Sequence, residues 1–104
     1  MKPLSVSNNF KVTAKARYDL LKIGQYTEVR WGKNQRNHYL KQLDEAFNLI
    51  AINPKIGTDR SHVLAGYRSF QQGSHVIYYK ASNVIEIVRI LHKQMDVGKY
   101  IQKT

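Results

Sequence analysis

The sequence has no cysteine, two prolines and only seven acidic residues in 104 positions. Without cysteine, a disulfide framework and a thiolate zinc site are excluded, and a reducing cytoplasm is the expected compartment. No uninterrupted apolar run approaches the roughly 18 residues of a membrane helix, and the N-terminal MKPLSVS lacks the apolar core of a signal peptide. A chain of this length holds one hydrophobic core rather than two. We therefore expect one cytoplasmic domain, residues 1–104, with no membrane partner.

The motifs of the common enzyme classes are absent as well. There is no glycine-rich phosphate loop, no nucleophile elbow and no pair of carboxylates at helical spacing beside a metal ligand. Asp44 and Glu45 are adjacent, so their carboxylates point in different directions on a helix. We expect neither a metal ion nor a cofactor.

Positive charge is what the sequence has in excess. Seventeen lysines and arginines against seven acidic residues give a formal net charge of +10. This excess favours an acidic partner, either nucleic acid or an acidic protein segment, although a well-solvated surface explains a moderate excess without any partner. The imbalance is largest in residues 1–41, where Asp19 and Glu28 face nine basic residues: Lys2, Lys11, Lys15, Arg17, Lys22, Arg30, Lys33, Arg36 and Lys41.

The N-terminal part of the sequence predicts a short strand and a helix. Residues 10–13 alternate like an edge strand, and Thr13 can then cap a helix by accepting from backbone N–H groups of the first turn. Through residues 14–31 the period changes to steps of three and four, which places one stripe of side chains on a helix face. The stripe consists of Ala16, Leu20, Ile23, Thr27 and Trp31.

A second helix is predicted almost at once. Gly32 supplies the left-handed turn that ends a helix, and Asn34 can cap a helix over residues 34–52. The helix ends before Pro54, because proline disfavours the helical conformation of the residue before it. Two helices with so short a joint are antiparallel neighbours. The apolar stripe of this helix is Leu40, Leu43, Phe47 and Ile50.

Three strand-like runs follow a loop over residues 54–66. They cover residues 67–71, 75–80 and 84–91, and the joints between them suit hairpin turns. The predicted fold is α+β with the order β-α-α-β-β-β, in which a helical hairpin packs on one face of a small antiparallel sheet.

The last of these runs is apolar on both of its faces. Two helices cover only one face of the sheet, so the other face needs a cover, either a partner or the loop 54–66 or the C-terminal tail. The tail, residues 96–104, is either a short helix or a mobile arm. Strict alternation predicts two opposite sets: Val84, Val88 and Ile90 with Glu86, and Ile85, Ile87 and Leu91 with Arg89.

Three stretches match one known pattern in the same order along the chain. They are AKARYDLLKIGQYTEVRWG at 14–32, GYRSFQQGSHVIYY at 66–79 and RILHKQMD at 89–96. Together they resemble the RelE/ParE toxins of bacterial toxin–antitoxin modules, the last two the ParE branch in particular, and the similarity covers residues 10–98. The resemblance implies a toxin neutralised by a cognate antitoxin whose acidic C-terminal part wraps it. ParE proteins poison DNA gyrase by stabilising the cleaved DNA complex, whereas RelE proteins cut messenger RNA on the ribosome, so the activity has to be decided at the site.

A ribosome-dependent ribonuclease is the alternative function. Cutting RNA at a 2′-hydroxyl requires a base, an acid and cations for the phosphorane charge. His75 and His92 could act as base and acid, because histidine titrates near pH 6.5. Each also has a structural explanation, His75 as an exposed strand start and His92 as a cap of the strand end through a backbone carbonyl. The residues available for this chemistry are Arg68, His75, Tyr79, Arg89 and His92.

The favoured hypothesis is a protein that acts by binding DNA gyrase and is not an enzyme. It would bind the gyrase cleavage complex and slow religation through a higher affinity for that state. By resemblance, the residues that contribute to holding gyrase lie at the end of the last strand: Arg89, His92, Lys93, Met95 and Asp96.

An acidic antitoxin, bound in a hetero-oligomer, is the second expected partner. An amphipathic acidic segment could lay apolar side chains beside Trp31 and Tyr39 and carboxylates against Arg30, Arg36 or Arg68. Non-specific contact with nucleic acid is also expected from the charge. The sequence shows no recognition-helix signature for sequence-specific DNA binding.

Overall fold

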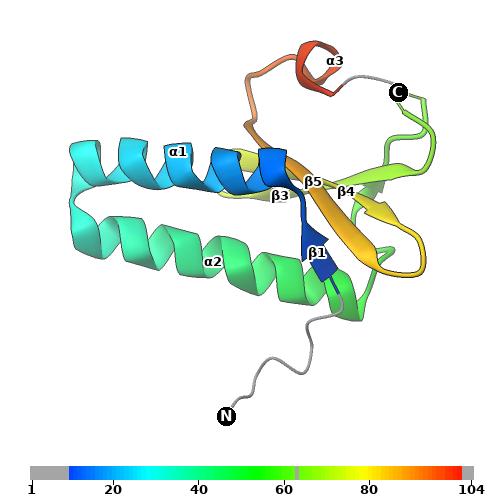
Figure 1. The fold of residues 1–104 in the computed structure, drawn as a ribbon, viewed down its shortest axis with the longest axis horizontal. Coiled ribbons are helices and arrows are strands. Elements are labelled where there is room, and N and C mark those ends of the chain that lie inside the picture. The colour runs from blue at the N-terminus through cyan, green and yellow to red at the C-terminus, as the bar shows by residue number, and fades with distance from the viewer. Residues whose placement is uncertain (1–9, 63, 102–104) are drawn as a thin grey trace.

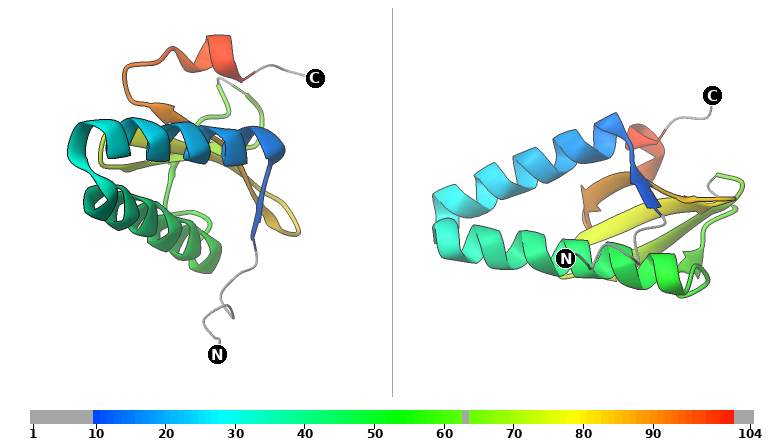
Figure 2. Two further views of the ribbon diagram at one scale, coloured as in Figure 1. Left: turned by 60° about the vertical axis from the view of Figure 1, so that its left-hand side comes forward. Right: turned by 60° about the horizontal axis from the view of Figure 1, so that its bottom comes forward.

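A helical hairpin covers one face of a five-stranded sheet (Figures 1 and 2). The structure, a computed structural model, describes residues 10–62 and 64–101. No helix within these residues is long and apolar enough to cross a membrane. The predicted α+β class and helical hairpin are confirmed. In chain order the elements are β1 (Phe10–Val12), α1 (Ala14–Trp31), α2 (Lys33–Ile52), β2 (Thr58–Asp59), β3 (Tyr67–Gln72), β4 (His75–Ala81), β5 (Ile85–His92) and α3 (Val97–Tyr100).

The two long helices share a single joint residue. The predicted cap of α1 is confirmed, because the Thr13 side chain accepts a hydrogen bond from the backbone N–H of Ala16 at 3.1 Å. Gly32, with φ of 93°, lies between the helices and is the C-cap of α1 as well as the N-cap of α2. The predicted cap at Asn34 is wrong: α2 begins one residue earlier, at Lys33, and no side chain caps it. Asn34 therefore lies inside the first turn.

The sheet is mixed, whereas the sequence predicted an antiparallel one. Its strand order is β1-β5-β4-β3-β2, and β5-β4-β3-β2 are antiparallel neighbours as expected for hairpins. The edge strand β1 pairs in parallel with β5, because the helical hairpin forms the long crossover that parallel pairing needs. The short strand β2 lies within the predicted loop, where two residues are too few to show a strand pattern.

A β-bulge in β5 breaks the alternation that the sequence predicted. Tyr78 pairs with Arg89 while Tyr79 pairs with Ile87, so Val88 has no partner on β4. One extra residue shifts every later side chain to the opposite face. The two predicted sets are therefore wrong beyond this point.

The core between the helices and the sheet contains the residue that the bulge redirects. Ile90 joins Ile85 and Ile87 on the helix-facing side, where strict alternation had placed it opposite to them. Trp31 is 67% exposed although it belongs to the predicted stripe of α1, because the hairpin joint projects beyond the sheet (Figure 1). The buried cluster consists of Ala16, Ile23, Leu43, Ala46, Phe47, Ile50, Ile77, Tyr79, Ile85, Ile87 and Ile90.

Contacts from the loop and the tail reach strands β3 and β5. Arg60, in the loop, donates through Nε to Ser69 Oγ at 2.8 Å, and Ser69 is buried. Arg89 donates through Nη1 to the Tyr100 carbonyl at 2.8 Å in the short tail helix α3. Leu91, which follows the bulge on the face away from the helices, is buried. The chain itself thus provides part of the expected cover. Of the two alternatives for the tail, a short helix is present at residues 97–100, while 102–104 lie outside the described residues.

Candidate functional site

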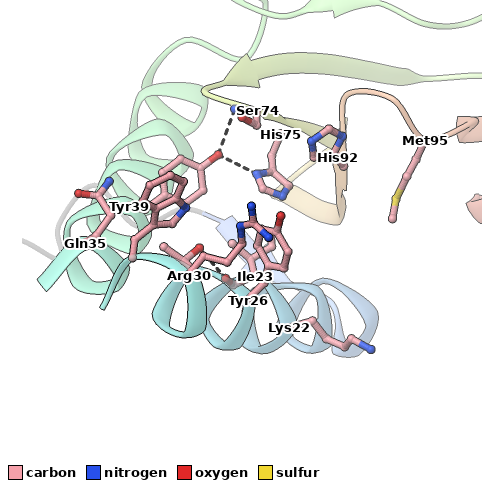
Figure 3. A pocket seen from close by; sticks show the side chains of 12 residues that line it. Lys22, Ile23, Tyr26, Arg30, Gln35, Tyr39, Ser74, His75, His92 and Met95 are labelled. Carbon is pink, nitrogen blue, oxygen red and sulfur yellow. Dashed lines mark hydrogen bonds between the residues drawn. The ribbon is translucent and has the colours of Figure 1, made fainter. Parts of the chain in front are cut away.

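A cavity of about 670 Å³ opens between α1, the start of α2 and the ends of β4 and β5 (Figure 3). One wall carries Tyr39, His75 and His92, and Tyr26 and Arg30 rise from α1 toward them. The cavity brings together residues that the sequence assigned to different partners, since Arg30, Trp31 and Tyr39 were predicted for the antitoxin and His92 and Met95 for gyrase. Its lining consists of Lys22, Ile23, Tyr26, Thr27, Arg30, Trp31, Gln35, Tyr39, Ser74, His75, His92 and Met95.

Tyr39 on α2 holds the turn between β3 and β4. Its hydroxyl lies 2.7 Å from His75 Nδ1 and 3.2 Å from the Gln72 carbonyl oxygen, and it accepts from the Ser74 backbone N–H at 3.2 Å. Burial raises the pKa of Tyr39, and hydrogen bonds from the backbone at Ser74 and His75 offset part of that increase. The sequence named Tyr39 as an antitoxin contact and missed this role, because the contact spans 36 residues of chain.

His75 and His92 stand opposite each other on β4 and β5. They are paired in register, and their ring centroids are 5.6 Å apart. Burial, with a smaller contribution from the neighbouring His92, lowers the pKa of His75 from 6.5 to about 4. A neutral His75 of this kind is a weak proton acceptor near pH 7. The expectation of an exposed His75 at the strand start is wrong, since the ring is half-buried against Tyr39.

His92 ends its strand differently from the expected cap. Its Nδ1 accepts a hydrogen bond from the Gln94 backbone N–H at 3.2 Å, so the ring contacts a backbone donor rather than a carbonyl. Its own carbonyl accepts from the Met95 N–H at 2.9 Å, which closes the turn that places Met95 on the cavity. Lys93 is exposed, and its backbone N–H donates to the Ser74 carbonyl at 2.9 Å.

Arg89 is bound to Asp19 of α1 across the open edge of β5. Its Nε and Nη2 donate to the two carboxylate oxygens at 2.8 and 2.9 Å, and the Ile90 backbone N–H donates to the same carboxylate at 2.9 Å. The Asp19 and Arg89 side chains are 10% and 16% exposed, and the bond to Asp19 raises the pKa of Arg89. Together with its bond to the Tyr100 carbonyl, this uses most donors of the guanidinium within the chain.

The other predicted residues lie in separate places. Tyr79 is fully buried, donates to the Pro54 carbonyl at 2.7 Å and accepts from the Gly57 N–H at 3.0 Å, so it holds the loop. Arg68 donates to the Gly57 carbonyl at 2.7 Å at the β2–β3 side of the sheet and does not line the cavity. Arg36 pairs with Glu28 across the helical hairpin.

Asp96 lies at the start of the short tail helix. Asp96 caps α3 by accepting from the Gly98 N–H at 3.0 Å, so its carboxylate has a structural use. Within residues 10–62 and 64–101, no three histidine, aspartate or glutamate side chains are grouped so that they could hold a metal ion.

Comparisons with known proteins agree with one another. The model of one family, described as the ParE toxin of the type II toxin-antitoxin system parDE, matches residues 10–97. Toxin ParE1 of Caulobacter vibrioides is 34% identical over 92 residues, which cover 88% of this chain and 96% of that protein. Toxin ParE1 of Mycobacterium tuberculosis is 34% identical over 96 residues, covering 90% and 98% of the two chains.

A solved structure supports the same fold. One chain in a structure of the chromosomal ParDE system from P. aeruginosa matches with a TM-score of 0.69 at 21% identity, over 80% of this chain and 92% of that one. At this identity the match supports the fold alone, while the family model and the curated relatives show which family the chain belongs to. The chain belongs to the ParE toxin family of type II toxin–antitoxin systems, within the RelE/ParE superfamily.

Proposed function

We propose that this toxin inhibits DNA gyrase by binding its DNA cleavage complex, without making or breaking covalent bonds itself. The proposal rests on the contacts and the burial of the candidate ribonuclease residues in the described part of the chain. His75 has a pKa lowered to about 4 by burial, and Arg89 is bound to Asp19. Tyr79 is buried in hydrogen bonds to the loop. These three groups therefore do not supply the general base and the free cation that RNA cleavage requires.

The surface that would hold gyrase lies at the end of β5. His92, Lys93 and Met95 are at least partly accessible there, and Met95 is 44% exposed. Arg89 and Asp96 contribute indirectly, by fixing the path of the segment between β5 and α3. A toxin that binds the cleaved state more tightly than the religated state shifts gyrase toward the cleaved state by the difference in affinity.

Neutralisation by an acidic antitoxin segment fits the same cavity. Arg30, Trp31 and Tyr39 line it together with His92 and Met95, so a segment bound to the first three residues would obstruct the last two. Within the described residues Arg30 has no carboxylate partner, which leaves it open to an acidic side chain. Replacing Arg30 with glutamate should weaken antitoxin binding at least about tenfold, a loss of about 1.4 kcal/mol, and lower its salt dependence. Lys41→Glu, outside the cavity, is the matched control, and equal losses in both variants would argue against this site.

The experiment that tests the proposed function has two arms. In the first arm, purified toxin is added to gyrase and supercoiled plasmid, and linear DNA is measured after denaturation. In the second arm, the same toxin is added to translating ribosomes, and new message ends are measured. We expect linear DNA only when gyrase is present, and intact messages. Cut messages together with unchanged plasmid would reverse the assignment in favour of the ribonuclease.

A further inference from the structure

Hydrogen bonds through Nδ1 hold both histidine rings of the cavity. The Gln94 backbone N–H donates to His92 Nδ1, so the neutral ring carries its proton on Nε2. The Tyr39 hydroxyl lies 2.7 Å from His75 Nδ1 and 3.2 Å from the Gln72 carbonyl oxygen, so the His75 ring is also held through Nδ1. The neutral His92 ring therefore presents an Nε2–H donor, and His75 Nε2 is a second polar atom of the same wall.

The Nε2 atoms of both rings have no hydrogen-bond partner in the described part of the chain. Every hydrogen bond of the His75 and His92 rings there is made through Nδ1. Both rings are partly exposed, and they line one cavity with their centroids 5.6 Å apart. The wall thus offers the His92 N–H group and the His75 Nε2 atom to a bound ligand.

A cation and two aromatic rings line the same cavity. The Arg30 guanidinium lies 5.4 Å from the centroid of the Tyr26 ring, and both residues point toward the histidines (Figure 3). Tyr26 and Trp31 are 61% and 67% exposed, which is high for large aromatic side chains that line a cavity. The cavity volume of about 670 Å³ lies in the range of about 300–1,000 Å³ typical of small-molecule sites.

We propose that this cavity binds one nucleotide. The phosphate accepts from the Nε2–H group of His92 and pairs with Arg30, next to the His75 ring, while the base stacks on Trp31 or Tyr26. Arginine suits phosphate because its donors form a planar fork, and base stacking on an aromatic ring tolerates any base. A simple acidic peptide, without the apolar side chains expected of the antitoxin segment, offers the carboxylate alone and leaves the exposed rings without a flat partner. A free nucleoside monophosphate and a nucleotide within a single strand present the same chemistry, and neither requires gyrase.

The test uses the fluorescence of Trp31, the single tryptophan of the chain. The full-length protein is titrated with a nucleoside 5′-monophosphate, the nucleoside, inorganic phosphate, a short single-stranded oligonucleotide and an acidic peptide, with excitation where the bases do not absorb. We expect saturable quenching by the monophosphate, and at least about tenfold weaker binding of the nucleoside and of phosphate alone. If the oligonucleotide binds as tightly as the monophosphate or more tightly, the ligand of the cavity is a nucleotide within a single strand. Binding then still requires both the phosphate and the base.

Variants locate the site. Arg30→Ala and His92→Gln should each weaken nucleotide binding about tenfold, while Lys41→Ala, an exposed lysine outside the cavity, should leave it unchanged. Circular dichroism checks that each variant is folded. Absence of saturable quenching by both nucleotide probes at millimolar concentration, equal binding of phosphate alone, stronger binding of the acidic peptide, or an equal loss in Lys41→Ala would each overturn the proposal. All these outcomes are independent of the gyrase assay.

Discussion

Replacing Asp19 with asparagine removes the negative charge that three donors of β5 share. The carboxylate accepts from Arg89 Nε and Nη2 and from the Ile90 backbone N–H, which has no strand partner at this open edge. Asparagine is nearly isosteric and keeps one oxygen acceptor. The substitution therefore tests the charge and the paired geometry rather than the packing.

The expected loss follows from how little of the pair is exposed. Breaking a fully buried ion pair by removing one partner costs about 3–5 kcal/mol, because the remaining charge is left uncompensated. Here the two side chains are 10% and 16% exposed and Arg89 keeps its bond to the Tyr100 carbonyl, which reduces the cost. We expect a loss of about 2–3 kcal/mol from a total stability of about 5–15 kcal/mol, and a fall in Tm of about 10–20 °C.

Urea unfolding followed by circular dichroism measures this loss. The matched control is Glu28→Gln, which breaks the ion pair with Arg36. The side chains of Arg36 and Glu28 are 30% and 37% exposed. An exposed pair contributes less than about 1 kcal/mol. If Asp19→Asn costs no more than Glu28→Gln at an unchanged m-value, the reasoning about the Asp19–Arg89 pair is wrong.

Three further substitutions test the cavity and the loop by the same unfolding assay. Tyr39→Phe removes the hydroxyl that holds the β3–β4 turn and should cost about 1–2 kcal/mol, whereas Tyr18→Phe at an exposed ring of α1 should cost little. Burial lowers the pKa of His75 from 6.5 to about 4. As the pH falls from 6.5 to about 4, this histidine is protonated in the unfolded chain but stays neutral in the native state, so the free energy of unfolding decreases over this range. The full shift is worth about 3 kcal/mol, partial exposure reduces it to about 1–2, and His75→Gln should remove this part of the pH dependence. Gly57→Ala places a Cβ 2.6 Å from a backbone oxygen and from a buried tyrosine hydroxyl and should cost about 1–3 kcal/mol, whereas Gly24→Ala, with its nearest contact at 3.4 Å, should stabilise α1 by up to about 1 kcal/mol.

The helices were predictable because their signals are local. Gly32 and Pro54 mark the ends of elements through their own backbone restrictions, and apolar steps of three and four mark the buried stripe. The bulge at Val88 was not predictable, because a valine in a bulge looks like its neighbours in sequence. Only the pairing of β5 with β4 shows that one residue is left over.

The candidate site was predictable in part for the same reason. Both histidines were named, and the short hairpin between β4 and β5 brings them opposite each other. The pKa of His75 depends on burial by side chains from distant elements, which no local pattern encodes. The Asp19–Arg89 bond joins residues 70 positions apart, so the sequence showed an acidic residue on a helix and an arginine on a strand without connecting them.

The most direct test of binding without chemistry is the yield of linear plasmid as a function of the ratio of toxin to gyrase. A toxin that only holds the cleavage complex should produce no further breaks once every gyrase molecule is saturated with toxin. The breaks should then disappear when the native complex is diluted and given time to religate. Breaks that keep accumulating at toxin levels far below those of gyrase, and that persist after dilution, would show catalytic turnover and contradict the account.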